Sequence, residues 1–537
     1  MHPALAMKDI LNEIFQNFQA EEWLTRREWW SNPDRYAMRP TTDKISLRNA
    51  ALTCRCFSGL ALDHLWCTFG SKLAKLLKLL PAFKRCRDNS VYVSVHPFCV
   101  SFPKPDLRLQ ILDGAIGDAD WVRFEFYAMK VKNLTAHLDL DDIDPSVFSH
   151  IVYLREGRPL FPALRNLDIK ISCSGTILPL FLSSRLLSIA LTHAPTEESA
   201  QCPGAWSVLH ALPTTIPGIH TLSLDLMLSD SALNAILRMT NLQHLHLLCP
   251  TPETKITYSF FWSLASLPKM VELSIPHVDI PSPPLTVDFP STPFPCLNSL
   301  SWNGDSFGDV IFLLEVPKEH GIKFLKVESQ RSRQPIHRDT WLRFFRTIST
   351  KFSKSLSKLH IEVLRDEQPP VTDDVRMFEP LLELHELEEF NVMNYAPWAT
   401  LQDADLLLMA KAWPKICVMH LQSNAVHPKV TFHGLHSLAS FCPHLCELWL
   451  PIDASSRANL KPVSLNVPSD HPLWYWNVGK SLIDDPALVA SRLDKMFPNL
   501  CIFMNHDPYI HNRHLWNQVA RGLPALRNVR RRCSQKT

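Results

Sequence analysis

A short apolar pattern that recurs along the chain limits the possible folds more than any other feature of the sequence. It consists of an aliphatic residue, two others, an apolar residue, one other and a further apolar residue. Copies start 22 to 34 residues apart, and a weaker one starts at Leu500. The alternation predicts strands, and helical stretches such as 403–413 and 432–442 separate them. The clear copies start at Leu164, Leu186, Ile219, Leu242, Met270, Leu297, Ile322, Leu356, Leu387, Ile416 and Leu445.

This pattern resembles the leucine-rich repeat, whose strand signature is LxxLxL. The resemblance implies an α/β solenoid over residues 131–505, with parallel strands on the concave face and helices outside. The Asn or Cys that the family places two residues after the motif is mostly missing, so we expect irregular curvature. Residues 81–130 are expected to form a linker with a first irregular repeat or cap. Residues 506–537 are expected to form a C-terminal cap and a basic tail.

Side chains between the buried leucines should face outward on the concave surface, at alternate strand positions. This surface is mixed in charge and partly aromatic, which suits the binding of a protein. Histidines two repeats apart would be about 10 Å from one another, too far to share a metal ion. His244, Glu328, Met393, Gln422 and Glu447 share this face. The candidate substrate contacts are His246, Lys326, His360, Glu362, Asn391, His420 and Trp449.

The N-terminal segment has helical rather than strand periodicity. A first apolar stripe comprises Leu5, Ile10, Leu11, Ile14, Phe15 and Phe18. A second follows the spacing of one helix face through Leu47, Ala50, Ala51, Cys54 and Phe57. We expect Gly59 to break this helix before a further turn that contains Leu62, Leu65 and Trp66. Cys54 and Cys56 would then point to opposite sides of a helix, so they could not share a metal, and Cys54 should face the core.

The segments ILNEIFQNF and LRNAALTCRCFSGLALDHLW together resemble the F-box, most closely F-box-like proteins of basidiomycete fungi. Two departures are Ala6-Met7 in place of Leu-Pro, and an insertion at residues 20–44. The tryptophans of the insertion, Trp23, Trp29 and Trp30, should hold it against the helices or extend the docking surface. The resemblance covers about the first 70 residues and implies an F-box-like helical module over residues 1–80. It implies docking on a Skp-type adaptor and, through it, on a cullin scaffold. The implied contacts or their supports are Leu5, Ile10, Leu11, Ile14, Phe15, Leu52, Cys54, Phe57, Leu62, Leu65 and Trp66.

These observations predict a substrate-recognition adaptor of a Skp–cullin–F-box ubiquitin ligase that holds a substrate protein on its repeats. The same N-terminal stripe would also suit a cap over the first repeat. In that case the chain would be a ligase-independent repeat scaffold or inhibitor. A third alternative is a hydrolase with zinc held by the C-terminal histidines His506, His511 and His514.

Composition and motifs argue against an enzyme. Glycine is scarce, with 14 residues, and GxGxxG, GxxxxGK[ST], GxSxG, HExxH and CxxC motifs are all missing. We therefore expect no catalytic site, cofactor or metal. The densest metal-like set is interpreted as part of an ordinary repeat, in which the cysteine before a proline is a core residue. This set comprises His433, His436, Cys442, His444 and Cys446.

A formal net charge of +2 gives no reason to expect nucleic acid or acidic lipid as a partner. The sequence shows neither a secretory signal nor a run of about 18 apolar residues, so we expect a cytoplasmic or nuclear protein with reduced cysteines. The basic tail is interpreted as a solvated terminus, with a nuclear-import signal as the alternative. Its arginines are Arg527, Arg530, Arg531 and Arg532.

Overall fold

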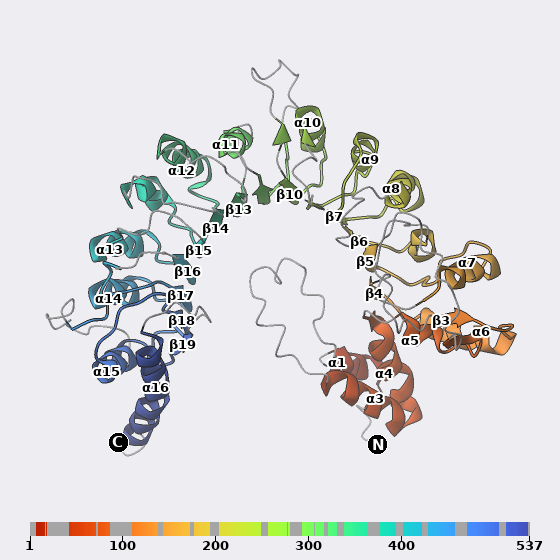
Figure 1. The fold of residues 1–537 in the computed structure, drawn as a ribbon, viewed down its shortest axis with the longest axis horizontal. Coiled ribbons are helices and arrows are strands. Elements are labelled where there is room, and N and C mark those ends of the chain that lie inside the picture. Colours follow the sequence, from red (N-terminus) through yellow and green to blue (C-terminus); the bar gives the residue numbers. More distant parts are fainter. Residues whose placement is uncertain are drawn as a thin grey trace. The chain divides into compact units, whose positions relative to one another are not determined.

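The chain has an α/β fold in which helices accompany the strands of a large parallel sheet, as seen in the computed structural model (Figure 1). This confirms the α/β part of the predicted fold. The structure describes residues 7–16, 18, 42–70, 73–85, 110–137, 143–171, 177–193, 203–248, 256–276, 278–279, 293–304, 307–315, 321–329, 338–363, 375–393, 401–421, 428–456, 470–503 and 512–534.

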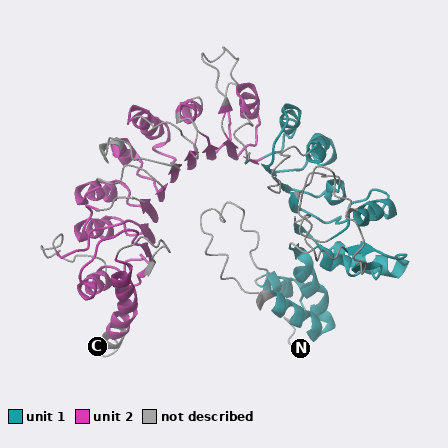
Figure 2. Cartoon of the chain, in the orientation of Figure 1, with its two compact units in different colours: residues 1–242, 248–254 teal, residues 243–247, 255–537 magenta. Residues whose placement is uncertain are grey.

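The chain divides into two compact units (Figure 2). Unit 1 comprises Met1–Leu242 and Leu248–Thr254, and unit 2 comprises Gln243–Leu247 and Lys255–Thr537. The division falls inside the predicted repeat array. Within each unit, most helices lie on one side of the strand ladder (Figure 2).

Unit 1 begins with helices and continues with parallel strands in the order β1, β4, β5, β6, β7. Between β1 and β4 in the sequence, β2 and β3 form a separate, short antiparallel pair. The elements are α1 (Lys8–Gln16), α3 (Thr42–Thr53), α4 (Arg55–Cys67), β1 (Thr68–Phe69), α5 (Ala74–Leu77), β2 (Phe83–Arg85), β3 (Gln110–Leu112), α6 (Asp118–Ala128), β4 (Asn133–His137), α7 (Pro145–Leu154), β5 (Asn166–Ile171), η3 (Leu178–Phe181), β6 (Ser188–His193), α8 (Pro203–Thr215), β7 (Thr221–Asp225) and α9 (Asp230–Ile236).

Unit 2 repeats the alternation of strand and helix, with its parallel strands in the order β8, β10, β12 to β19. A two-stranded parallel pair, β9 and β11, is separate. The elements are β8 (His244–Leu247), β9 (Ile256–Thr257), α10 (Tyr258–Ala265), β10 (Glu272–Pro276), β11 (Val278–Asp279), β12 (Ser299–Asn303), α11 (Phe307–Glu315), β13 (Phe324–Ser329), α12 (Arg338–Phe352), β14 (Lys358–Val363), η4 (Val375–Glu383), β15 (Glu389–Met393), α13 (Asp403–Ala412), β16 (Val418–Leu421), α14 (Phe432–Phe441), β17 (Glu447–Trp449), β18 (Tyr475–Asn477), α15 (Pro486–Met496), β19 (Cys501–Phe503) and α16 (Arg513–Ser534).

Every clear copy of the apolar pattern contains a strand, which starts two residues after the copy does. The predicted helices at 403–413 and 432–442 are also confirmed, as α13 and α14. The weaker copy forms β19, but its alignment is wrong by one residue. Ile502, not Phe503, lies opposite Trp476 in the leucine position.

Burial along the strands alternates with a period of two. In β13 the apolar Leu325 and Val327 are buried, whereas Lys326 and Glu328 are partly exposed. From β4 to β18, the buried positions of the other ladder strands hold mainly leucine or isoleucine, with alanine, valine, methionine, phenylalanine or tryptophan in some strands. Because each strand packs these residues beside the same positions of its neighbours, the core is a continuous apolar layer within each unit.

Side-chain caps connect successive helices. Asp403 at the start of α13 accepts hydrogen bonds from the backbone of Thr431 and Gly434, at 2.7 and 2.9 Å, and so caps α14 of the following repeat. The Thr431 hydroxyl donates to the same carboxylate at 2.6 Å. This satisfies backbone N–H groups that the first turn of a helix leaves without partners.

The C-terminal helix closes the ladder of unit 2. Trp516 of α16 is fully buried and donates from its indole nitrogen to the Ser481 carbonyl at 3.1 Å. The solvated tail predicted for the arginines is wrong for two of them. Arg527 donates to the carbonyls of Pro498 and Leu500, both at 3.0 Å, and Arg530 pairs with Asp494.

Candidate functional site

Helices α1, α3 and α4 enclose a core of their own, and we call residues 7–67 the N-terminal module. Leu11 and Phe15 of α1 are buried with Leu47 of α3 and Ala61 of α4. The Phe15 ring packs edge-on against Phe57, with ring centroids 5.9 Å apart. This cluster draws on residues of the module itself, so the module has the internal packing of a small folded unit.

Several apolar residues of the module stay at its surface. Ile10 and Ile14 are each 38% exposed, and Leu52 is 76% exposed. Met7 and Ile45, which the sequence analysis did not select, are 57% and 54% exposed. Five large exposed apolar side chains on so small a module favour a protein-binding surface.

The structure splits the predicted adaptor contacts into two groups. Leu11 and Phe15 expose only 3% and 4% of their surface, so they support the module from within. Along one stripe of α1, the Ile10 side faces solvent and the Phe15 side faces α4. Cys54, Phe57, Leu62, Leu65 and Trp66 are partly buried. Leu5 and residues 20–41 of the insertion, with Trp23, Trp29 and Trp30, lie outside the described residues.

The helix pair breaks at Cys54, so the predicted break at Gly59 is wrong. Cys54 has extended backbone, with φ −158° and ψ 163°, and its carbonyl accepts the backbone N–H of Ser58 at 3.0 Å to start α4. The Thr53 hydroxyl bonds to the Asn49 carbonyl at 2.8 Å and closes the last turn of α3. Gly59 lies inside α4, and Cys54 is only partly buried.

Trp66 connects the module to the first strands of unit 1. Its ring stacks on Phe69 of β1 at 5.9 Å and packs against Tyr127 of α6 at 4.7 Å. Asp63 of α4 pairs with Lys130, whose ammonium lies 4.4 Å over the Phe126 ring. Trp66 therefore acts within the chain, as a contact between the module and the ladder.

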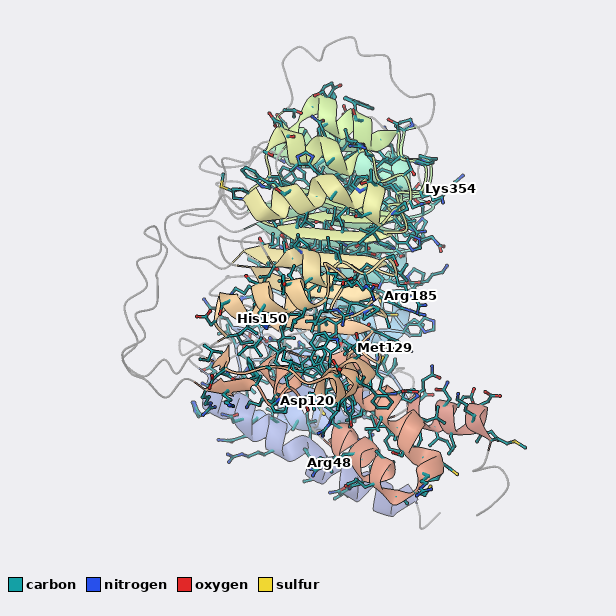
Figure 3. All side chains as sticks on the ribbon, turned by 90° about the vertical axis from the view of Figure 1, so that its right-hand side faces the viewer. Arg48, Asp120, Met129, His150, Arg185 and Lys354 are labelled. Carbon is teal, nitrogen blue, oxygen red and sulfur yellow. The ribbon has the colours of Figure 1, made fainter. Side chains whose placement is uncertain are left out.

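The helix α6 exposes a second apolar stripe in unit 1. Val122, Phe126 and Met129 are 66%, 51% and 58% exposed and follow the spacing of one helix face. Met129 and Asp120 mark this part of the molecule in Figure 3. The sequence analysis placed residues 81–130 in a linker or irregular repeat and did not single out this stripe.

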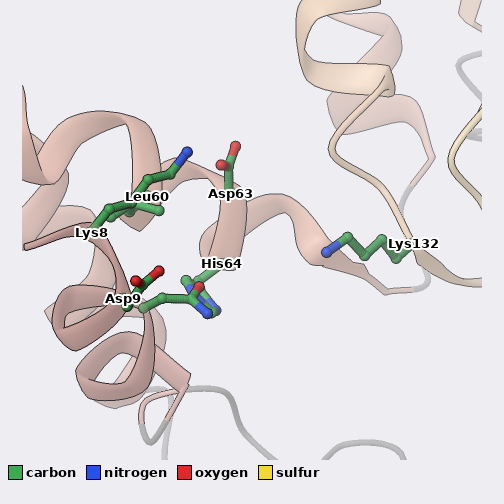
Figure 4. Close-up of a pocket in the computed structure, with 7 residues that line it drawn as sticks. Lys8, Asp9, Leu60, Asp63, His64 and Lys132 are labelled. Carbon is green, nitrogen blue, oxygen red and sulfur yellow. The ribbon is translucent and has the colours of Figure 1, made fainter.

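A shallow pocket opens between α1, α4 and the start of β4 (Figure 4). In it, a ring nitrogen of His64 hydrogen bonds to the Asn12 side chain at 2.9 Å. Burial lowers the pKa of His64, the Lys132 charge lowers it further, and Asp63 acts in the opposite direction. The lining mixes both signs of charge, which does not favour a charged ligand. The lining residues are Lys8, Asp9, Asn12, Leu60, Asp63, His64 and Lys132.

The predicted substrate contacts of unit 2 lie in line on its strands. Neighbouring strands align His246 with Ser274, Ser301, Lys326, His360, Asn391, His420, Trp449 and Asn477. We call this set the central row. Six of the seven predicted contacts belong to it, and Glu362 lies two residues further along β14. All seven predicted contacts are partly exposed, in agreement with the predicted alternation, whereas Asn477 at the end of the row is buried. Gln422 lies outside the described residues.

A compact ion cluster lies beside the central row. Glu389 of β15 binds His360 at 3.3 Å and also pairs with Lys358. Burial acts to raise the pKa of Glu389, but the hydrogen bonds and charges of His360 and Lys358 outweigh it and hold the pKa at about 2. Glu389 is therefore ionised throughout the physiological range, and these three side chains satisfy one another.

The next two residues of the row lack such partners. The side-chain oxygen of Asn391 and both ring nitrogens of His420 are inaccessible and have no hydrogen-bond partner. The His420 ring packs edge-on against Trp449, with centroids 5.9 Å apart. Burial, with a contribution from the His360 charge, lowers the pKa of His420 to about 4, against the opposing effect of Glu389. His420 is thus uncharged at neutral pH.

The metal-like set of the sequence analysis lies in an ordinary repeat. Cys442 is buried, its thiol points at the carbonyls of Ala410 and Trp413 at 3.7 and 3.8 Å, and burial raises its pKa to about 12. Across the described part of the chain, no group of three or more His, Cys, Asp or Glu side chains is placed to hold a metal ion. His506 and His511 fall outside that part, whereas His514 lies in α16.

None of the helices in the described ranges combines the length and apolar character needed to cross a membrane.

No protein-family model matches the chain, and none of the curated proteins matches it.

The sequence analysis missed several residues of the strand face. Lys358 and Glu389, which form the ion cluster with His360, precede the second leucine position of their motifs. That position also faces outward, as its partial exposure in β13 to β17 shows. Reading both outward positions of each LxxLxL copy, rather than the one between the last two apolar residues, would have found them.

Proposed function

We propose that this protein is a substrate-recognition adaptor of a Skp–cullin–F-box ubiquitin ligase. In this proposal the N-terminal module is an F-box-like domain that docks on the Skp adaptor. The strand ladder is a leucine-rich-repeat solenoid whose strand face binds a substrate protein. The chain does no bond chemistry and acts in the cytoplasm or nucleus by raising the effective concentration of substrate lysines near the ligase.

The observation that carries the proposal is that some apolar side chains of the module are buried in its own core while others are exposed to solvent. Leu11 and Phe15 complete an internal core, while Ile10, Ile14 and Leu52 remain exposed. A helical segment that served only to cover the ladder would direct its apolar residues toward the strands. Exposed aliphatic side chains on a self-packed module are what a docking domain for another protein needs.

One contact favours a second candidate function, a ligase-independent scaffold or inhibitor. Trp66 packs on Phe69 and Tyr127, as expected of a module that caps the first strand. A cap of this kind would protect the edge strand β1 without requiring an adaptor. The two candidates differ in one measurable respect, the binding of the Skp adaptor.

Co-precipitation of the full chain with the Skp adaptor tests the proposal. Ile14→Asp should weaken binding about tenfold or more, the loss expected when a charge replaces a central contact residue, and Ile10→Asp should act similarly. Leu408→Asp is the matched control, because Leu408 is 55% exposed on α13 of unit 2 and should not affect binding. Phe15→Asp is unsuitable, since it would place a charge in the module core.

Circular dichroism must show that the variants remain folded. If Ile10→Asp and Ile14→Asp, singly and together, bind the adaptor as well as the unchanged protein does, the adaptor-docking assignment is wrong. If the unchanged protein does not bind the adaptor at all, the scaffold function replaces it.

A further inference from the structure

The strand face of unit 2 carries two neighbouring carboxylates, of which one has an ion-pair partner among the described residues. Glu328 of β13 and Glu362 of β14 lie directly opposite each other on adjacent strands. Like charges in this arrangement repel across the strands. Lys326 pairs with Glu328, but the described residues offer no ion pair to Glu362. Burial raises the pKa of Glu362, Glu328 adds to the effect, and Lys326 opposes it.

A second, independent observation is that polar side-chain atoms on the next two strands lack hydrogen-bond partners. Asn391 of β15 and His420 of β16 are register neighbours, and three of their polar atoms have no hydrogen-bond partner. Buried polar atoms are almost always hydrogen bonded in folded proteins, because leaving them without a partner is unfavourable. Asn391 Oδ1 requires a donor, and the uncharged His420 ring offers one donor and one acceptor. A peptide group or a side-chain amide supplies both kinds of partner.

The charges of this face favour a positively charged ligand. Glu328, Glu362, Glu389 and Glu447 lie on strands β13 to β17, and the cations among these outward positions are Lys326 and Lys358. Both lysines already pair with carboxylates, Lys326 with Glu328 and Lys358 with Glu389. Among these outward positions of the described strands, a phosphate group would therefore meet carboxylates and no available cation, whereas an ammonium or guanidinium group would relieve the repulsion at Glu362.

We propose that the strand face from β13 to β17 binds a basic, non-phosphorylated peptide segment of a partner protein. A lysine or arginine side chain of the segment sits at Glu328 and Glu362. Rotation of the partly exposed Asn391 and His420 side chains brings their polar atoms to peptide or amide groups of the segment, and Trp449 provides an apolar contact beside them. The inference rests on the proposed function only in taking this face as the substrate surface.

An immobilised library of random peptides, half of them with phosphoserine at fixed positions, tests this inference with the full chain. Enrichment of lysine or arginine and depletion of phosphoserine are expected. Glu362→Gln should weaken binding of the enriched basic peptides about tenfold. Glu383→Gln is the matched control, because Glu383 is exposed on η4, away from the strands, and should not change binding.

His420→Phe tests whether His420 takes part in peptide binding or only in the stability of the fold. It should weaken peptide binding while the protein becomes more resistant to denaturant, because it removes two unpartnered ring nitrogens. Enrichment of phosphoserine or acidic residues, no enrichment at all, or unchanged binding by Glu362→Gln would overturn the inference. Adaptor co-precipitation is a separate measurement, so loss of the ligase assignment and loss of the peptide site can be told apart.

Discussion

Replacement of His420 by phenylalanine should make the protein less sensitive to acid. The pKa of His420 falls from an ordinary value of 6.5 to about 4 in the folded protein, mainly because the ring is buried. Between these pH values the unfolded chain binds a proton that the folded protein does not. Stability is therefore lost as pH falls from 6.5 toward 4.

The size of this effect follows from the same two pKa values. At pH 5 the unfolded histidine is almost fully protonated and the folded one is mostly neutral, which costs the folded state about 2 kcal/mol. At pH 8 both are neutral and the cost vanishes. His420→Phe should therefore raise the free energy of unfolding by about 2 kcal/mol more at pH 5 than at pH 8.

Urea unfolding followed by circular dichroism at both pH values measures this difference. His514→Phe is the control, because it makes the same substitution at an exposed position on α16. The Phe ring can keep the edge-on contact with Trp449, so the substitution tests the buried nitrogens rather than packing. An equal stability change at pH 5 and pH 8 would refute the reasoning.

Two further substitutions test the packing of unit 2. Asp403→Ala removes the cap that Thr431 and Gly434 donate to, and should lower the free energy of unfolding by about 2 kcal/mol. Urea midpoints would measure it, and a change below about 0.5 kcal/mol would contradict the capping role. Trp516→Ala should cost about 3–5 kcal/mol, because the buried indole leaves a cavity against Trp476. Faster amide exchange in α15 and α16 is expected, and unchanged exchange there would contradict the assignment of α16 as the closing cap.

The strands could be predicted because one physical requirement repeats. Each strand must bury apolar side chains at alternate positions against its neighbours, and leucine usually fills them. The pattern failed where another residue fills the same place. Trp476 occupies the leucine position of β18, with its indole nitrogen donating to the Leu450 carbonyl at 3.1 Å. The interval between the copies at Leu445 and Leu500 is about twice the others, which is the signal for this strand.

The N-terminal module was harder to predict in detail. Apolar periodicity identifies α1 and α4, but it does not say which edge of a stripe the chain itself covers. Phe15 and Ile14 are consecutive members of one stripe, yet Phe15 packs against Phe57 and Ile14 stays exposed. The break at Cys54 was missed because the residue has no strong turn preference, whereas Gly59 is compatible with the helix that contains it.

The strand face gains its selectivity from the order of residues across successive strands. In a stacked ladder, an outward side chain can find protein partners mainly on the strands beside it. His360 and Lys358 are satisfied because Glu389 lies on the next strand, within reach of both. Asn391 has that His360 on one side and His420 on the other, and neither supplies its oxygen with a donor. The ion cluster thus leaves the polar atoms of the adjoining positions without partners, and we propose that a partner protein binds where the ladder does not complete its own hydrogen bonds.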